Sequence, residues 1–291
     1  MKKVLVTGAT GFIGNYVVQQ LLQMDVAVIA SSANAEKAGT FSWFNQVQYI
    51  PFQFESFDPA INYYRFFGEP DLMIHLAWEG LPNYRAAFHT DINLPRHFAL
   101  LQNLVQNGLT DVAVTGTCFE YGMQEGCLRE DMAVFPANPY ALAKNTLREQ
   151  LQAFQQQHPF SLKWIRLFYM FGKGQNPNSL LSQLDKALAA GEPVFNMSGG
   201  EQVRDYLPVE KVAAYIATIA LQKQVTGIIN CCSGQPVKII DFVNDYLARK
   251  KQTITLNLGY YPYPDYEPMR FWGDASKLKT ILINPLSQID T

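Results

Sequence analysis

The sequence is short of the residues that mark several classes of protein. Its 291 residues include only four cysteines and four histidines, and its formal net charge is −2. Because there is no excess of basic residues, the charge balance gives no indication of a nucleic acid or an anionic membrane as a partner. The cysteines show no metal-ligand spacing, and the adjacent pair Cys231 and Cys232 indicates a buried strand rather than a disulfide.

Long apolar runs and targeting signals are also absent. No stretch approaches the roughly 18 continuous apolar residues of a membrane-spanning helix. Lys2 and Lys3 precede a strand pattern rather than the apolar core of a signal peptide. We therefore expect a cytoplasmic protein with no membrane, nucleic-acid or metal partner, whose histidines have core or surface roles. The length allows one large domain or two modest ones.

A glycine-rich turn follows the first apolar run of the chain. Val4 to Val6 reads as a strand, and the apolar residues from Tyr16 to Leu22 recur at helical spacing. A strand, a glycine turn and a helix in this order indicate dinucleotide binding, with the pyrophosphate at the helix N-terminus. An ordinary turn between a strand and a helix is the alternative. The predicted cofactor contacts here are Gly8, Thr10, Gly11, Phe12, Ile13 and Gly14.

The end of the second predicted strand, Val26 to Ile29, bears on the choice of cofactor. An acid after this strand would hold the ribose 2′-hydroxyl of NAD, but Ser31 and Ser32 stand here instead. Lys37 follows a few residues later, where its ammonium group can reach a phosphate. These residues favour NADP(H) over NAD(H). In the alternative interpretation the two serines only cap a loop.

Two further apolar runs predict parallel strands with ligand contacts at their ends. After the run 47–52, Gln53 occupies a position suited to contact adenine. The run Leu72 to Leu76 ends at Ala77, Trp78 and Glu79, and ligands bind beyond the carboxyl ends of such strands. We expect Leu76, Ala77 and Trp78 to contact the cofactor, and Trp78 and Glu79 to contact substrate. Simple packing of the Trp78 ring on the next helix is the alternative.

A tyrosine and a lysine follow the fifth predicted strand, Asp111 to Val114. Asn138 can cap a helix on which Tyr140 and Lys144, four residues apart, share a face. A nearby ammonium group lowers the pKa of a phenol from its usual value of about 10. With Thr117 as a hydrogen-bond partner, this phenol can exchange a proton with a substrate oxygen during hydride transfer. A solvated helix face is the alternative.

These motifs resemble the extended short-chain dehydrogenases/reductases, in their branch of nucleotide-sugar epimerases, dehydratases and reductases. The similarity covers nearly the whole chain and includes the segments Thr7–Gly14, His75–Ala77, Asn93, Thr117–Gly122, Tyr140–Lys144, Arg166–Gly172 and Val203–Tyr206.

The resemblance implies a role for several of these residues. Thr117 matches the catalytic hydroxyl, Tyr140 the acid–base group, and Lys144 the residue that holds the ribose and tunes the tyrosine. Asn93 matches an asparagine of the active-site helix, counted here among the cofactor contacts. The family also implies a homodimer formed through the helices that begin near Asp91 and Tyr140.

Two arginines resemble the family's diphosphate-binding residues. Arg204 matches one of them, and Arg270 resembles a second. Guanidinium groups suit this task because they form paired hydrogen bonds with phosphate oxygens. An ion pair of Arg204 with Asp205 or Glu201 is the alternative.

Departures from the family pattern narrow the reaction. Cys118 and Phe119 replace the acid pair of the sugar 4,6-dehydratases, and Cys118 lies one residue nearer the catalytic hydroxyl than the cysteine of enzymes resembling GDP-fucose synthase. Tyr169 and Gln53 replace a usual asparagine and aspartate. The intact redox set favours NAD(P)H-dependent reduction of a 4-keto-6-deoxy nucleotide sugar. The predicted substrate contacts are Trp78, Glu79, Cys118, Phe119, Tyr169, Arg204 and Arg270.

Two other functions remain open from the sequence. A 4-epimerase would retain its NAD through the cycle, and a regulatory protein would sense NADP without chemistry. For the fold, we expect a Rossmann-type, doubly wound parallel α/β sheet with a smaller C-terminal α/β substrate domain. Residues 1–168 plus 208–232 would bind NAD(P), and residues 169–207 plus 233–291 would bind the sugar nucleotide. The second segment contains a tyrosine-rich loop at 260–266, which either stacks a base or sugar or only packs a surface turn.

Overall fold

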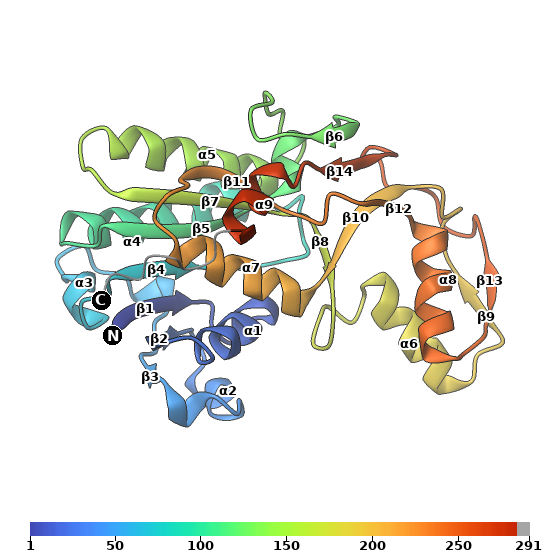
Figure 1. Ribbon diagram of the computed structural model, residues 1–291, viewed down its shortest axis with the longest axis horizontal. Coiled ribbons are helices and arrows are strands. Elements are labelled where there is room, and N and C mark those ends of the chain that lie inside the picture. The colour runs from blue at the N-terminus through green and yellow to red at the C-terminus, as the bar shows by residue number, and fades with distance from the viewer. Residues whose placement is uncertain (284–291) are drawn as a thin grey trace.

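The chain folds into a large sheet-centred part and a smaller part beside it (Figure 1). The computed structural model describes residues 1–283. The end of the predicted substrate segment, 284–291, lies outside the described residues. None of the described helices is long and apolar enough to cross a membrane.

The large part is built on a seven-stranded parallel sheet. Its order is β11-β7-β5-β4-β1-β2-β3, so the chain reverses its direction of progress between β1 and β4. Ligands bind beyond the strand ends at such a reversal. This arrangement confirms the predicted doubly wound fold. The strands are β1 (Lys2–Thr7), β2 (Val26–Ser31), β3 (Gln48–Tyr49), β4 (Leu72–His75), β5 (Asp111–Thr117), β7 (Ser161–Leu167) and β11 (Gly227–Cys231).

Helices cover both faces of this sheet, which explains why its strands are almost continuously apolar. Side chains alternate along β1, so Val4 and Val6 pack toward one helical layer and Leu5 toward the other. Full burial of each contributes about 1.5–3 kcal/mol. The first layer contains α1 (Phe12–Leu21), α7 (Val209–Leu221) and α9 (Ser276–Ile283); the second contains α3 (Tyr63–Phe66), α4 (Leu94–Gln106) and α5 (Pro139–Gln155); the short α2 (Ala35–Gly39) follows β2.

Two predicted elements of the large part differ in the structure. The strand expected at 47–52 is reduced to Gln48–Tyr49, although the Ile50 and Phe52 N–H groups still donate to Ala30 and Ser32. Pro51 lies between these two donors, at a position that faces away from β2, so it removes no bond to that strand. The helix expected from Asp91 begins as a π turn, His89–Asn93, and becomes regular only at Leu94. Pro95 in the first turn cannot donate a backbone bond to the preceding turn.

The smaller part has its own apolar cluster, which includes Leu184, Phe195 and Val243. A three-stranded sheet of order β12-β10-β8 lies between this cluster and the large part. The elements are β8 (Tyr169–Phe171), α6 (Leu180–Ala190), β9 (Val194–Asn196), β10 (Val203–Pro208), β12 (Pro236–Lys238), α8 (Ile239–Lys250) and β13 (Thr255–Asn257), while β6 (Gly126–Leu128) pairs with β14 (Phe271–Gly273).

The last described helix returns to the large part. Leu278 and Ile281 of α9 are buried in the cluster that contains Val4 of β1. The helix predicted at 274–282 therefore exists but packs on the large sheet, although the expected substrate segment 233–291 included it. Cys231 and Cys232 are buried at the end of β11, as their adjacency predicted, and none of the four cysteines is in a disulfide.

Candidate active site

The glycine turn between β1 and α1 leaves room for a phosphate at the helix N-terminus. Gly8 has φ of +71°, and a Cβ there would lie 2.7 Å from the Ala77 backbone nitrogen. A Cβ on Gly14 would lie 2.1 Å from the Gly8 oxygen. Gly11 is exposed at the start of α1 and forms no side-chain cap, so N–H groups of the first turn face outward. These residues fit a dinucleotide, with Thr10, Phe12 and Ile13 in the same turn.

Beyond this turn, a hollow of about 340 Å³ lies where the adenosine end of such a cofactor is predicted. Gln53 lines it and donates through Nε2 to the Ala33 oxygen at 3.2 Å. Ser31 is buried, while the Ser32 hydroxyl lies 3.0 Å from the Tyr49 hydroxyl. The predicted roles of Gln53, Ser31 and Ser32 in cofactor binding stay predictions.

A cavity of about 570 Å³ lies between the two parts of the chain. Aromatic rings dominate its walls. It brings Thr117, Cys118, Phe119, Tyr140 and Tyr169 together, as the sequence suggested. Trp78, Glu79 and Arg270 do not belong to the described residues that line it. The lining also includes residues that sequence reasoning did not assign to the site, among them Tyr84, Tyr206, Phe242 and Glu267.

Tyr140 is placed by the start of α5. The Asn138 carboxamide accepts from the Ala141 N–H at 2.9 Å and caps the helix, and the Tyr140 N–H donates to the Tyr84 oxygen at 3.1 Å. The phenol is buried beside the Thr117 hydroxyl at the end of β5. Burial raises the pKa of Tyr140, and a hydrogen bond with Thr117 opposes this rise only in part. The phenol is therefore protonated near neutral pH.

Lys144 departs from its predicted electrostatic role. Its ammonium group is buried against the ring of Trp78, with 4.3 Å between Nζ and the ring centroid. Burial lowers the pKa of Lys144 to about 7, although the Glu120 carboxylate opposes this change. The prediction that Lys144 lowers the pKa of Tyr140 is wrong for the protein without bound ligands. Removal of the phenol from water raises its pKa and outweighs any effect of the lysine.

Trp78 forms the wall behind Lys144. Its indole N–H donates to His89 Nδ1 at 3.1 Å, and its ring stacks on His97 with 4.6 Å between centroids. Asn93 is buried and donates to the Glu79 backbone oxygen at 3.1 Å, whereas the Glu79 side chain is exposed. The Trp78 ring thus packs against the π turn and α4 that follow it, as the alternative interpretation of the sequence predicted.

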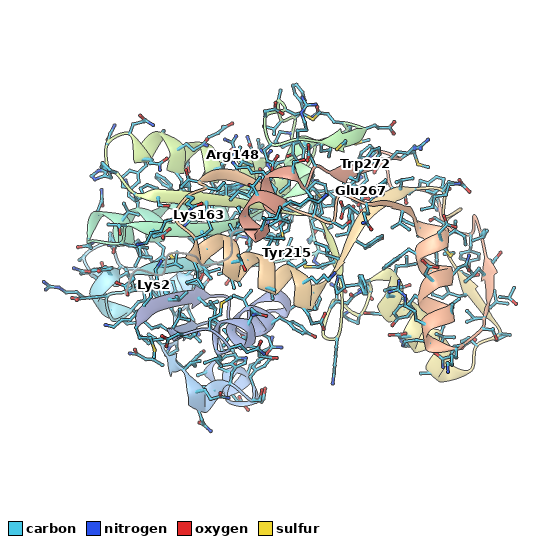
Figure 2. All side chains as sticks on the ribbon, viewed as in Figure 1. Lys2, Arg148, Lys163, Tyr215, Glu267 and Trp272 are labelled. Atoms are coloured by element: carbon cyan, nitrogen blue, oxygen red, sulfur yellow. The ribbon has the colours of Figure 1, made fainter. Side chains whose placement is uncertain are left out.

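Arg204 is buried in β10 and paired with a carboxylate that the sequence did not indicate. Its Nη2 donates to Glu267 Oε2 at 2.8 Å, and neither Asp205 nor Glu201 is the partner. Figure 2 shows Glu267 at the boundary between the two parts. Arg270 is exposed and pairs through its backbone with Gly126 and Val203. Diphosphate binding by either arginine stays a prediction.

Two loops meet over the cavity, one from each part. Arg85 and Asp265 form an ion pair, and the Arg85 guanidinium lies 5.5 Å from the ring centroid of Tyr266. The rings of Tyr84 and Tyr266 are 6.3 Å apart. Tyr266 belongs to the tyrosine-rich loop noted in the sequence, whereas Tyr260, Tyr261 and Tyr263 are exposed. This loop therefore contributes one cavity wall.

The fold and this site define the class of protein. The model of the NAD dependent epimerase/dehydratase family matches residues 4–232, and the chain belongs to that family. It is an oxidoreductase-type enzyme of the extended short-chain dehydrogenase/reductase fold.

Curated relatives include sugar-nucleotide enzymes. The chain is 28% identical over 271 residues to dTDP-6-deoxy-L-talose 4-dehydrogenase (NAD(+)) of Aggregatibacter actinomycetemcomitans, covering 93% of this chain and 98% of that protein. It is 25% identical to UDP-glucose 4-epimerase of Neisseria meningitidis serogroup C, covering 96% and 91%.

Solved structures share the fold. UDP-glucuronic acid 4-epimerase from Bacillus cereus, in complex with UDP-glucuronic acid and NAD, superposes with a TM-score of 0.82 at 23% identity, covering 98% of this chain and 95% of that chain. MoeE5 in complex with UDP-glucose and NAD gives a TM-score of 0.80 at 24% identity, covering 99% and 94%.

Proposed function

We propose that the protein reduces a 4-keto-6-deoxy nucleotide sugar with a nicotinamide cofactor. The observation that carries this proposal is the buried pair of Thr117 and Tyr140. Their hydroxyl groups meet on the wall of a cavity that begins at the glycine turn and ends in the smaller part. The similarity to dTDP-6-deoxy-L-talose 4-dehydrogenase supports the same reaction at the 4-position.

The chain's own residues supply the proton chemistry. A bound reduced nicotinamide would supply the hydride. Thr117 orients the substrate carbonyl oxygen, and the protonated Tyr140 phenol donates its proton to that oxygen as it becomes a hydroxyl. Lys144 lies one helical turn after Tyr140, where the family resemblance assigns it to the cofactor ribose.

The cavity walls support a deoxygenated sugar. Phe119 lies edge-on to Tyr84 with 5.1 Å between centroids, and also faces Tyr266 at 6.3 Å. The faces and edges of such rings bury a methyl group favourably, whereas the oxygen of a hydroxymethyl group packed against them would lose its hydrogen bonds with water. We expect the 6-methyl group to lie among them.

For the cofactor, we propose a preference for NADP(H). No carboxylate occupies the end of the described strand β2, and Lys37 is exposed on α2 nearby. A carboxylate here would repel a 2′-phosphate, and an ammonium would attract it. The two solved structures named above are complexes with NAD. Dissociation constants of both reduced cofactors, measured by fluorescence titration, test this preference.

A panel of nucleotide-linked 4-keto sugars tests the function. Each compound is incubated with NADPH and with NADH, and nicotinamide absorbance is followed. We expect stoichiometric oxidation of the cofactor with the 6-deoxy compounds. Absence of oxidation with every keto sugar would contradict the proposal.

The same assay separates the two alternatives. A 4-epimerase would copurify with tightly bound NAD and would convert a 4-hydroxy sugar without net oxidation of added NADPH. A regulatory protein that senses NADP would bind dinucleotide but turn over no sugar; the meeting of Thr117 and Tyr140 in the cavity argues against it.

The activity should fall as the pH rises through the pKa of Lys144. The family resemblance assigns the Lys144 cation to the cofactor ribose, and burial lowers the pKa of Lys144 to about 7. Because the charged form is lost above that value, kcat/KM for the keto sugar should decline from about pH 7 upward. The measurement is a pH profile at saturating cofactor. A flat profile from about pH 6 to pH 9 would show that the charge of Lys144 is not required.

We also propose a homodimer formed through the π turn before α4 and through α5. Ile92 and Leu142 expose 43% and 47% of their surface on these neighbouring elements. Their burial between two copies would remove apolar area from water. Light scattering of the purified protein tests this state, and a monomeric mass would contradict it.

A further inference from the structure

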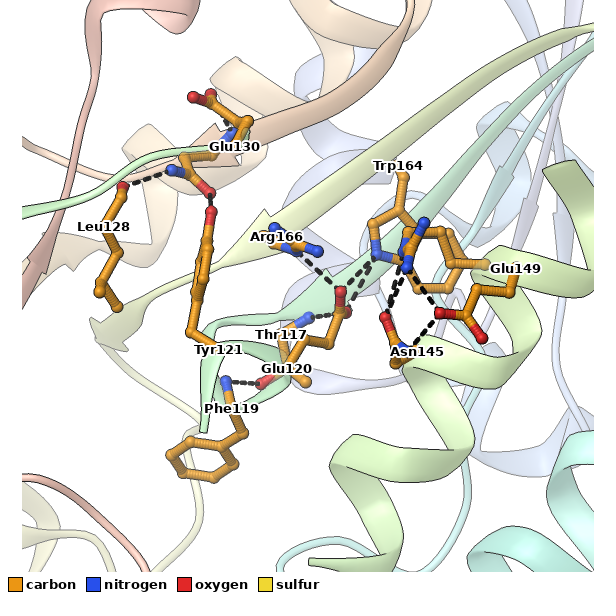
Figure 3. A network of polar contacts seen from close by, with 12 residues as sticks. Thr117, Phe119, Glu120, Tyr121, Leu128, Glu130, Asn145, Glu149, Trp164 and Arg166 are labelled. Atoms are coloured by element: carbon orange, nitrogen blue, oxygen red, sulfur yellow. Dashed lines mark hydrogen bonds and ion pairs between the residues drawn. The ribbon is translucent and has the colours of Figure 1, made fainter. Parts of the chain in front are cut away.

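A buried carboxylate lies directly behind the proposed catalytic groups. Glu120 belongs to the short 3-10 turn Cys118–Tyr121 that follows β5, and its side chain is fully buried. Figure 3 shows it among donors from β5 and β7. Arg166 Nε donates to Oε2 at 2.8 Å, and the indole N–H of Trp164 lies 3.0 and 3.1 Å from the two carboxylate oxygens.

One oxygen of this carboxylate holds the backbone of Thr117. The Thr117 N–H donates to Glu120 Oε1 at 2.9 Å, while the Thr117 hydroxyl accepts from the Phe119 N–H at 3.3 Å. This reciprocal arrangement fixes the turn. Because the hydroxyl oxygen accepts from the backbone, its proton stays available for a second hydrogen bond on the side of Tyr140 and the cavity.

The same carboxylate is connected to Lys144 through an aromatic ring. Lys144 Nζ lies 5.7 Å from the ring centroid of Trp164, whose N–H points to Glu120. Donation of that N–H to an anion makes the face of the indole more electron-rich, and a cation is attracted to such a face. Trp164 therefore lies between the charges of Glu120 and Lys144 and still allows the carboxylate to stabilise the cation.

The other groups around Lys144 do not supply negative charge. His75 and His97 of β4 and α4 and His89 of the π turn have lowered pKa values, so they are neutral near pH 7. The pKa of Tyr140, on the same helix, is raised. Glu120 is the carboxylate that favours the charged form of Lys144.

We propose that Glu120 is a positioning residue that orients Thr117 and sustains the positive charge of Lys144. It touches neither cofactor nor substrate and acts through the Thr117 backbone and the Trp164 ring. The effect of Glu120 on catalysis rests on the proposed function, but its effect on the charge of Lys144 can be measured without any substrate.

The test is Glu120→Gln, which removes the charge while keeping an oxygen for the Thr117 N–H. The protein is labelled with 13C at lysine Cε, and the Lys144 signal, assigned with Lys144→Met, is followed against pH with and without NADP⁺. We expect the midpoint of Lys144 to move down by roughly one pH unit, the order expected for loss of a nearby charge. The alkaline decline of kcat/KM should move down with it.

Asp111→Asn is a matched control. Asp111 lies at the opposite end of β5 and pairs with the buried Lys163, with 2.7 Å between Nζ and Oδ1. Figure 2 shows Lys163 within the large part, away from the boundary where Glu267 lies. This variant also removes a carboxylate from a buried pair, and the midpoint of Lys144 should stay as in the wild type.

Trp164→Phe is a second variant that keeps the Glu120–Arg166 pair intact. It retains a ring beside Lys144 but removes the N–H that connects this ring to the carboxylate. We expect a smaller downward shift in the same direction. This variant decides the question if Glu120→Gln does not fold, since loss of its charge leaves the Arg166 guanidinium buried without its partner.

The outcomes separate this inference from the proposed function. An unchanged Lys144 midpoint in the folded Glu120→Gln protein, or in Trp164→Phe when the former is unfolded, would overturn the inference even if keto sugars are reduced. A shifted midpoint without turnover of any keto sugar would overturn the proposed function and leave the electrostatic role of Glu120 in place.

Discussion

Tyr140→Phe is expected to lose about 10²- to 10⁴-fold in kcat, the usual contribution of a positioned proton donor. The phenol is buried next to the Thr117 hydroxyl, and its raised pKa keeps the proton in place for donation. The ring itself would remain, so the affinity for NADPH should be nearly unchanged. Steady-state kinetics with the keto sugar, together with a cofactor titration, measure both effects.

Tyr121→Phe is the matched control for this substitution. Tyr121 is also buried and donates its hydroxyl proton to Asn230 at 2.8 Å, but it is not among the described residues that line the cavity. Loss of that bond should lower stability by about 1 kcal/mol with little effect on kcat. Near-normal turnover by Tyr140→Phe would show that Tyr140 is not the donor.

Gly14→Ala is expected to weaken dinucleotide binding by roughly 10- to 100-fold. Its Cβ would lie 2.1 Å from the Gly8 oxygen, so α1 must move away from the turn that receives the phosphates. Overpacking of this kind costs about 1–3 kcal/mol, and about 1.4 kcal/mol corresponds to a tenfold change in dissociation constant. Fluorescence titration with NADPH and NADH measures the effect.

Gly39→Ala provides the comparison, because a Cβ on this glycine of α2 meets nothing within 4 Å. It should bind the cofactor as the wild type does. If Gly14→Ala bound NADPH equally well, the close approach of α1 to the turn would not be what forms the site.

The parts predicted well from sequence are those whose cause is local. The apolar run of β1, the glycines after it and the period of α1 are neighbours in the chain, so one segment contains the whole signal. The cap formed by Asn138 similarly fixes where α5 begins and hence where Tyr140 points. The shortened β3 shows the limit of such reasoning, since the apolar run 47–52 does not indicate where its regular pairing with β2 ends.

Other features depend on residues far apart in the chain or on burial, and the sequence could not predict them. Arg204 pairs with Glu267, which is 63 residues away. Glu120 lies inside the Thr117–Gly122 motif, but its side-chain donors Trp164 and Arg166 belong to β7 and could not be identified as partners from the sequence. The lowered pKa of Lys144 results from its enclosure by two indoles, which no spacing rule contains.

The contact of Arg85 with Asp265 has a consequence for the speed of the enzyme. Both side chains are mostly exposed, at 64% and 80%, and exposed ion pairs are worth only about 0–1 kcal/mol. Separating the two loops at this point thus costs little free energy, so this pair would not impose a slow opening step on the entry or release of the proposed substrate. Added salt, which screens such charges, should leave the rate of product departure almost unaltered.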